Sequence, residues 1–458
     1  MNFMTKFLSL GMTFKVLILL VSIFLVFLGT TSFNYSKNSK QDFDIKAKSI
    51  ILKWYNLFLK LESKDIYAYP PISAHRIAQI GIAGSLTINE MQNSFINKED
   101  ITLLVLNQVY SEVISSFFKT NMSSFQLVSE LEENIAHSFA HSDLQAEKVS
   151  LYSKNILNRL NSHLQQKSNL PCQSKISNTN NKLDNYQFNS LHPILPDWGS
   201  RPTLFINQED ILFQDPYFKY SSFKIALHQD ALGVYTHSIN MSKEDQWIAE
   251  FWSDDVRGLT FSPAGRWIAI TNQIVQLENI SVSDMITLYL KLGIGLNDAA
   301  TLCWKNKYHY NLERPSAFIN KHIDPAWKPF HDDPNFPSYP SGHAVLGAVS
   351  AIILEKTFGI NYKFTDKSHH TRMEFFGKKR SFDSIKAMAL ENAYSRFVMG
   401  VHYKEDCESG LRLGFDIGNL VNASDPAIII NHLTRNALSG NIQRLTIDSN
   451  SIPLNQIN

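Results

Sequence analysis

The sequence predicts an all-α protein built as a multi-helix bundle. Apolar residues recur three and four positions apart through several long stretches, whereas stretches that alternate apolar and polar residues are few. Hydrophobic residues make up 44% of the 458 positions and charged residues 19%, so the chain can bury a large core. The near balance of 43 Lys and Arg against 42 Asp and Glu excludes a disordered tail protein and a broadly basic nucleic-acid-binding protein. Three cysteines without C-x-x-C spacing exclude a disulfide scaffold and a zinc ribbon.

Residues 1–33 predict a signal peptide or a membrane anchor. Lys6 and Lys15 precede an apolar run, Val16–Leu28, which small residues follow. The stretch Met12–Phe33 is also just long enough to span a bilayer as a helix. No Ala-x-Ala site follows the run, so cleavage stays open, and a helix packed within the fold is the alternative. We expect an exported protein, in the periplasm, the cell envelope or outside the cell, whose contact with the membrane is confined to this segment.

Helical periodicity then recurs along the chain. The stretches with this pattern are Ile50–Leu61, Ile101–Phe118, Ile286–Trp304, Ala344–Phe358, Ile385–Met399 and Leu411–Val421. The segment Lys224–Tyr235 predicts a short hairpin or a loop instead. Residues 160–190 are rich in Asn, Ser, Gln and Lys and predict a polar linker inside the helical domain. Residues 426–458 are weakly patterned, and we expect them to form a peripheral tail.

Three short motifs in the last third of the chain bring together cations, a hydroxyl group and two histidines. They are Lys307 followed after six residues by Arg314-Pro315, then Pro340-Ser341-Gly342-His343, then Ser395-Arg396 followed after five residues by His402. Cations and hydroxyl groups are the donors that bind phosphate-like anions, whereas histidine exchanges protons or attacks as a nucleophile near neutral pH. The three motifs together therefore predict an oxyanion site with catalytic histidines.

The spacing of these residues suggests how they reach one site. Lys307 and Arg314 are two helical turns apart and would share one face of a continuous helix, which we expect Pro315 to end. The segment around Ser341 and Gly342 precedes an apolar helical run, so it predicts a helix N-terminus. Backbone N–H groups and the helix dipole bind anions there, and glycine permits close approach.

Each residue also has a structural interpretation. Lys307 and Arg314 could be solvated helix charges, Ser341 could be a helix N-cap, and His402 could be a hydrogen-bonded core histidine. The co-occurrence of all three motifs favours the shared site.

The motifs resemble the signature of a known superfamily, that of type 2 phosphatidic acid phosphatases and vanadium haloperoxidases. That signature is KxxxxxxRP, PSGH and SRxxxxxH, and all ten of its specified positions are present. The resemblance implies that an oxyanion, phosphate or vanadate, is bound by the residues Lys307, Arg314, Ser341, Gly342 and Arg396. It further implies that His402 is the nucleophile in a phosphatase, or the ligand of vanadate in a haloperoxidase, and that His343 transfers protons.

Similarity outside the signature favours the bacterial haloperoxidase-like branch and extends over roughly residues 45–425. The matching segments are 54–85, 249–255 with 262–265, and 304–311, although Ser262-Pro263-Ala264 departs from the expected Pro-Pro-Gly. Phe336 and Trp304 match pocket residues of chloroperoxidases, or simply pack the pocket wall. Asp255 matches an acidic residue that is expected to orient Arg396.

The resemblance predicts a vanadate-dependent haloperoxidase that oxidises halide with hydrogen peroxide. One alternative is a secreted acid phosphatase that forms a phosphohistidine at His402 and needs no cofactor. The other is a non-catalytic oxyanion-binding protein of the cell envelope. The expected partners are small molecules, either halide and peroxide or a phosphate ester, and nucleic acid is not among them.

Overall fold

The computed structural model describes residues 40–93, 99–119, 121–139, 143–168, 186–207 and 222–434, except 255, 257–258, 371 and 373–377. The expected leader, Asp255 and residues 435–458 of the expected tail lie outside these ranges. The chain divides into two compact units, residues 1–51 and 52–458. Residues 40–51 of the first unit are helical, and everything that follows concerns the second unit.

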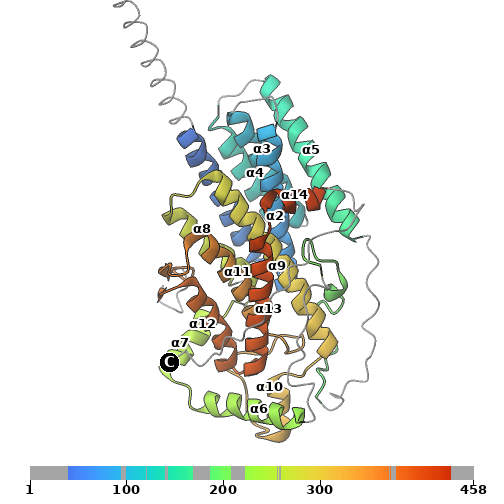
Figure 1. Cartoon of the computed structure of the whole chain (residues 1–458), viewed down its shortest axis with the longest axis vertical. Helices are drawn as coiled ribbons and strands as arrows, with labels where there is room; N and C mark the ends of the chain where they lie inside the picture. Colours follow the sequence, from blue (N-terminus) through green and yellow to red (C-terminus); the bar gives the residue numbers. More distant parts are fainter. Residues whose placement is uncertain are drawn as a thin grey trace, which may run out of the picture. The chain divides into compact units, whose positions relative to one another are not determined.

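The second unit confirms the all-α prediction (Figure 1). After a helix over residues 52–62, the elements are α2 (Pro70–Asn93), α3 (Glu99–Phe117), α4 (Met122–Ala136), α5 (Asp143–Ser168), the 3₁₀ turn η1 (Trp198–Ser200), α6 (Phe223–Ile239), α7 (Lys243–Phe251), α8 (Pro263–Leu277), α9 (Val282–Tyr310), α10 (Pro315–His322), α11 (Gly342–Phe358), β1 (Phe364–Asp366), β2 (Arg380–Phe382), α12 (Ile385–Val398), α13 (Lys404–Ala423) and α14 (Pro426–Thr434). Within the described residues, no helix is both long and apolar enough to cross a membrane.

Helix α11 lies at the centre of the helices that form the site. It packs against α8, α9, α12 and α13, and α9 also packs along α2 (Figure 1). A side chain at Gly414 of α13 would place its Cβ 2.3 Å from the carbonyl oxygen of Val345 in α11. Glycine at this position therefore lets the two helices touch backbone to backbone.

Three expectations about the chain's organisation were wrong in part. The segment Lys224–Tyr235 is neither hairpin nor loop but lies in α6, where the spacing of Phe223, Leu227, Ala231 and Val234 buries one helical face. The expected linker begins too early, because residues 160–168 belong to α5. Residues 426–434 form α14, which buries Ile429 and Ile430 and contacts α2, α5 and α9.

Lys307 and Arg314 do not share a continuous helix, contrary to the expectation from their spacing. Helix α9 ends at Tyr310, and Asn311 adopts a left-handed conformation with φ 50°. Pro315 then starts α10 instead of ending α9, because proline at the first helical position lacks only an N–H that needs no helical partner. Arg314 is the residue just before α10, so the two cations come from separate elements.

A two-stranded antiparallel hairpin, β1 with β2, follows α11 and carries polar residues into the core. Asp366, at the end of β1, and His369, in the loop after it, are almost fully buried. Burial, followed by the nearby Arg266 guanidinium, lowers the pKa of His369 to about 2. Between about pH 2 and the ordinary histidine pKa of about 6.5, His369 therefore stays neutral in the folded protein while the unfolded chain protonates it.

This difference predicts an acid-dependent loss of stability. Because only the unfolded state takes up the proton of His369, acidification from pH 7 to pH 5 should destabilise the native protein relative to His369→Gln. Between pH 7 and pH 5, the unfolding free energy of the wild type should fall by about 2 kcal/mol more than that of His369→Gln. The stabilisation from neutral His369 is fully lost below its folded pKa. Urea unfolding of both proteins at the two pH values measures it. A difference that is the same at both values would contradict a neutral buried His369.

Candidate functional site

A cavity of about 460 Å³ opens where the three sequence motifs meet. Its wall contains site residues from the start of α11, the end of α12 and the loop that follows it, together with Trp304 of α9 and a loop over residues 331–336. The predicted residues that line it directly are Trp304, Phe336, Gly342, His343, Arg396 and His402. Lys307, Arg314 and Ser341 lie behind this wall, each almost fully buried. The structure therefore brings the three motifs together.

The two histidines are both neutral. Nε2 of His402 lies 3.1 Å from Nη1 of Arg314, and Nε2 of His343 lies 3.3 Å from Nη1 of Arg396. A guanidinium group can only donate, so each imidazole nitrogen must offer its lone pair. Burial comes first in holding both pKa values well below the usual range, followed for His402 by Arg314 and for His343 by Arg396. Neutral histidines can act as nucleophiles, ligands or proton acceptors.

Asp406, which sequence reasoning missed, fixes the orientation of His402. Its Oδ2 lies 3.0 Å from Nδ1 of His402, and it also accepts from the Ser338 hydroxyl at 2.5 Å and from the Tyr403 N–H at 3.1 Å. Burial raises the pKa of Asp406 to about 7, but three donors on one oxygen favour the carboxylate. The proton of His402 is then on Nδ1, so Nε2 presents a lone pair, which contacts Arg314 in this structure and which a ligand would take in its place. The spacing of four residues between His402 and Asp406 was the available signal.

Backbone carbonyl groups aim the three cations. Nζ of Lys307 donates to the carbonyl oxygens of Pro337 and Ser338 at 2.8 and 2.9 Å. Arg314 donates from Nε to Phe336 at 3.0 Å and from Nη1 to Val401 at 2.7 Å. These carbonyl oxygens orient the side chains but carry no net charge. The site therefore combines cationic side chains with fixed donor directions, which suits an oxyanion.

Ser341 provides the test of whether an oxyanion fits this site. Ser341 stands at the N-cap position of α11, but its buried Oγ makes no capping hydrogen bond and has no hydrogen-bond partner among the described residues. A buried hydroxyl without a partner is costly, so a ligand oxygen would satisfy it. Its neighbour Gly342 begins α11 and lines the cavity. A tetrahedral group of the phosphate or vanadate type matches this donor set, with His402 as the nitrogen ligand.

Trp304 and Phe336 form the aromatic wall expected from the sequence. Their ring centroids are 5.0 Å apart, and both side chains are almost fully buried. Nζ of Lys307 lies 5.0 Å from the centroid of the Phe336 ring, and the guanidinium carbon of Arg314 lies 4.9 Å from it. The aromatic wall therefore also supports two cations through cation–π contacts.

Arg396 is held by the backbone of an earlier segment. Its Nη2 donates to the carbonyl oxygen of Trp252, and its Nε to Oγ of Ser395 at 3.0 Å. The expected partner, Asp255, lies outside the described residues, so its pairing with Arg396 stays a prediction. A backbone carbonyl acceptor leaves no sequence signal, which is why Trp252 was not identified.

Replacing Arg396 with alanine should weaken oxyanion binding by about 1.5–3 kcal/mol, because one charged donor is lost. Isothermal titration of the purified protein with orthovanadate and with orthophosphate measures the effect. Arg412→Ala, which removes a half-exposed arginine of α13, is the control and should bind like the wild type. An unchanged affinity of Arg396→Ala would refute its placement at the anion.

Sequence comparison relates these residues to known proteins. Residues 287–428, which contain all three motifs, match a family model described as the VCPO second helical-bundle domain. Vanadium chloroperoxidase of Curvularia inaequalis is 25% identical over 282 residues, 46% of this chain and 46% of that protein. Vanadium-dependent bromoperoxidase of Ascophyllum nodosum is 31% identical over 90 residues, 18% of this chain and 16% of that protein. The chain thus aligns with less than half the length of either relative.

Solved structures with the same fold extend over more of the chain. The crystal structure of a bacterial vanadium-dependent iodoperoxidase matches with a TM-score of 0.63 and 23% identity, covering 81% of this chain and 95% of that one. A holo-type bacterial vanadium-dependent chloroperoxidase matches with a TM-score of 0.58 and 13% identity, covering 82% and 96%. At these identities the likeness shows a shared fold.

Proposed function

Because this chain belongs to the superfamily of vanadium haloperoxidases and type 2 phosphatidic acid phosphatases, we propose that it is a vanadate-dependent haloperoxidase. The observation that carries this proposal is His402, a neutral histidine whose Nδ1 lies 3.0 Å from Oδ2 of Asp406 and whose Nε2 presents its lone pair beside three buried cations. The chloroperoxidase, bromoperoxidase and iodoperoxidase among its relatives and structural neighbours support the choice of reaction.

The chain's own residues would divide the work. His402 would hold vanadate, and Lys307, Arg314, Ser341, Gly342 and Arg396 would surround its oxygens. When bound, vanadate supplies a Lewis acid that activates hydrogen peroxide toward halide. His343, neutral and at the cavity surface, can take a proton from an entering O–H group and return it. Trp304 and Phe336 keep water from part of the site.

An assay of both reactions on one preparation tests the proposal. The purified protein, with and without orthovanadate, is supplied with hydrogen peroxide and chloride, bromide or iodide, and separately with nitrophenyl phosphate. Vanadate-dependent oxidation of any of the halides supports the haloperoxidase. Hydrolysis of the phosphate ester that vanadate inhibits would replace it with the phosphatase. Tight binding of the anion without either reaction would favour the non-catalytic alternative.

A further inference from the structure

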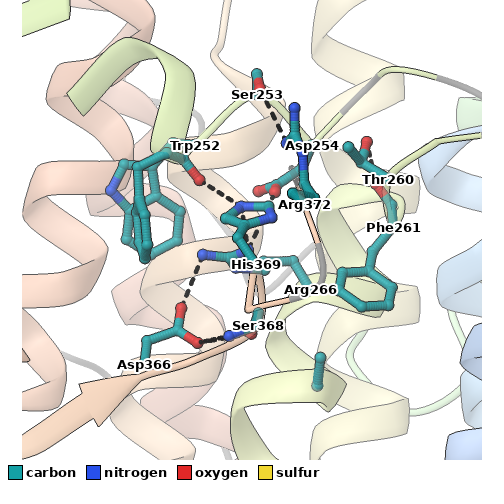
Figure 2. A network of polar contacts seen from close by, with 12 residues as sticks. Trp252, Ser253, Asp254, Thr260, Phe261, Arg266, Asp366, Ser368, His369 and Arg372 are labelled. Carbon is teal, nitrogen blue, oxygen red and sulfur yellow. Dashed lines mark hydrogen bonds and ion pairs between the residues drawn. The ribbon is translucent and has the colours of Figure 1, made fainter. Parts of the chain in front are cut away.

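A buried arginine behind the cavity is tied to several parts of the fold at once. Arg266 of α8 is fully buried and does not line the cavity. Its Nη2 lies 2.7 Å from Oδ2 of Asp366 at the end of β1, and its Nη1 lies 3.8 Å from Oδ1 of Asp254 (Figure 2). The other oxygen of Asp366 accepts from Nε2 of Gln273 and Oγ of Ser368, at 3.1 and 2.6 Å. The carboxylate that anchors Arg266 is therefore itself fixed.

His369 connects this arginine to the end of α7 (Figure 2). Its Nε2 lies 2.5 Å from Nη1 of Arg266 and 2.7 Å from the carbonyl oxygen of Phe251. The guanidinium can only donate and the carbonyl oxygen can only accept, so Nε2 of His369 makes one of these two contacts as a hydrogen bond at a time, and either one ties the imidazole to this corner of the fold. The guanidinium carbon also lies 4.8 Å from the ring centroid of Phe251 and 5.1 Å from that of Trp252.

The segment held in this way, residues 251–254, forms part of the site. The carbonyl oxygen of Trp252 accepts from Nη2 of Arg396, and Ser253 and Asp254 line the cavity. The side chain of Trp252 has a second anchor, because its Nε1 donates to Glu391 at 2.9 Å. That anchor fixes the indole ring, whereas Arg266 lies over both aromatic rings, pairs with Asp254 after the Trp252 carbonyl and reaches the Phe251 carbonyl before it through His369.

We propose that Arg266 is a positioning residue for Arg396. It acts through the backbone of residues 251–254: it holds the Trp252 carbonyl in the place where that carbonyl aims Arg396 at the bound oxyanion. Lysine could not replace it, because one ammonium group cannot reach Asp366 and His369 with two planar donors while stacking on two aromatic rings. This inference rests on the oxyanion site of the proposed function but not on which of its reactions takes place.

Orthophosphate binding tests the inference without any turnover. Isothermal titration at a temperature where each variant is folded should show Arg266→Gln binding orthophosphate roughly 10-fold or more weakly than the wild type, the usual effect of losing a residue that orients a ligand-binding group. Arg266→Lys, a milder change, should weaken binding by about threefold or more, so the test does not depend on the glutamine variant folding. Arg412→Gln is the control, since Arg412 also pairs with a carboxylate, Glu405 at 2.6 Å, and neither residue lines the cavity. It should bind orthophosphate as the wild type does.

A double-mutant cycle separates positioning from general destabilisation. If Arg266 acts through Arg396, then Arg266→Gln in an Arg396→Ala background should cause little further loss of phosphate affinity. An equal loss in both backgrounds would overturn the inference, as would Arg266 variants that bind phosphate normally while unfolding more easily. Wild-type protein that binds neither phosphate nor vanadate would overturn the oxyanion site and this inference together.

Discussion

Replacement of His402 by alanine is expected to abolish tight vanadate binding. The carboxylate of Asp406 orients the His402 ring, and loss of this ring removes the coordinate bond that His402 is proposed to supply. A structural zinc site gains about 10–16 kcal/mol from four ligands, so one such bond is worth on the order of 3 kcal/mol, or roughly 10²-fold in affinity. Titration with orthovanadate measures this loss.

The control for this variant is Asp406→Asn. It leaves the imidazole in place but removes the carboxylate that orients it, so vanadate affinity should fall by less than in His402→Ala. If the protein is a phosphatase, His402→Ala should instead form no covalent phosphoenzyme. If His402→Ala binds vanadate as tightly as the wild type, the assignment of His402 as the ligand is wrong.

Replacement of His343 by alanine should give the opposite pattern. The anion should still bind, because His402 and the three cations remain, but turnover should slow by about 10²–10⁴-fold, the usual contribution of a general acid or base. Steady-state kinetics at saturating substrate, together with vanadate titration of the same preparation, separate these two effects. His343→Gln keeps a side chain of similar size that cannot transfer protons and should be equally slow.

The contrast between the two histidines is the decisive result. Similar behaviour of His343→Ala and His402→Ala in both measurements would contradict their division into proton donor and ligand. Loss of the anion in His343→Ala with retention in His402→Ala would reverse their roles.

Several helices were predictable from apolar residues that recur three and four positions apart. The periodic stretches that correspond to α3, α11 and α12 were found within a few residues of their ends, whereas Leu411–Val421 missed the first seven residues of α13. Helix α6 was missed because its apolar residues lie all around its axis, with Ile225, Leu232 and Ile239 exposed opposite the buried face. The role of Pro315 was also predicted wrongly. A proline that follows a helical pattern can end the preceding helix or begin the next one, and Pro315 begins α10.

The residues of the site were predictable where their side chains belong to short sequence motifs. All seven motif residues assigned to the oxyanion site or to catalysis are buried around one cavity or line it. The groups that orient them could not be predicted in the same way. A backbone carbonyl group, such as that of Trp252, is present in every residue type, so the sequence does not mark it. Arg266 lies 130 positions before Arg396, too far for any local pattern to connect them. Contacts of that kind are determined by tertiary packing alone.

The backbone contact between α11 and α13 at Gly414 has a consequence for how a ligand is received. The first turn of α11 holds Ser341 and His343, whereas the first turn of α13 holds Asp406, whose carbonyl oxygen also accepts from the Ser341 N–H at 2.9 Å. The donor groups of these two helices are thus fixed relative to one another before any anion arrives. Capture of the anion is then recognition by a rigid receptor, in which the entropy lost is mainly the translational and rotational freedom of the anion, with little contribution from the chain.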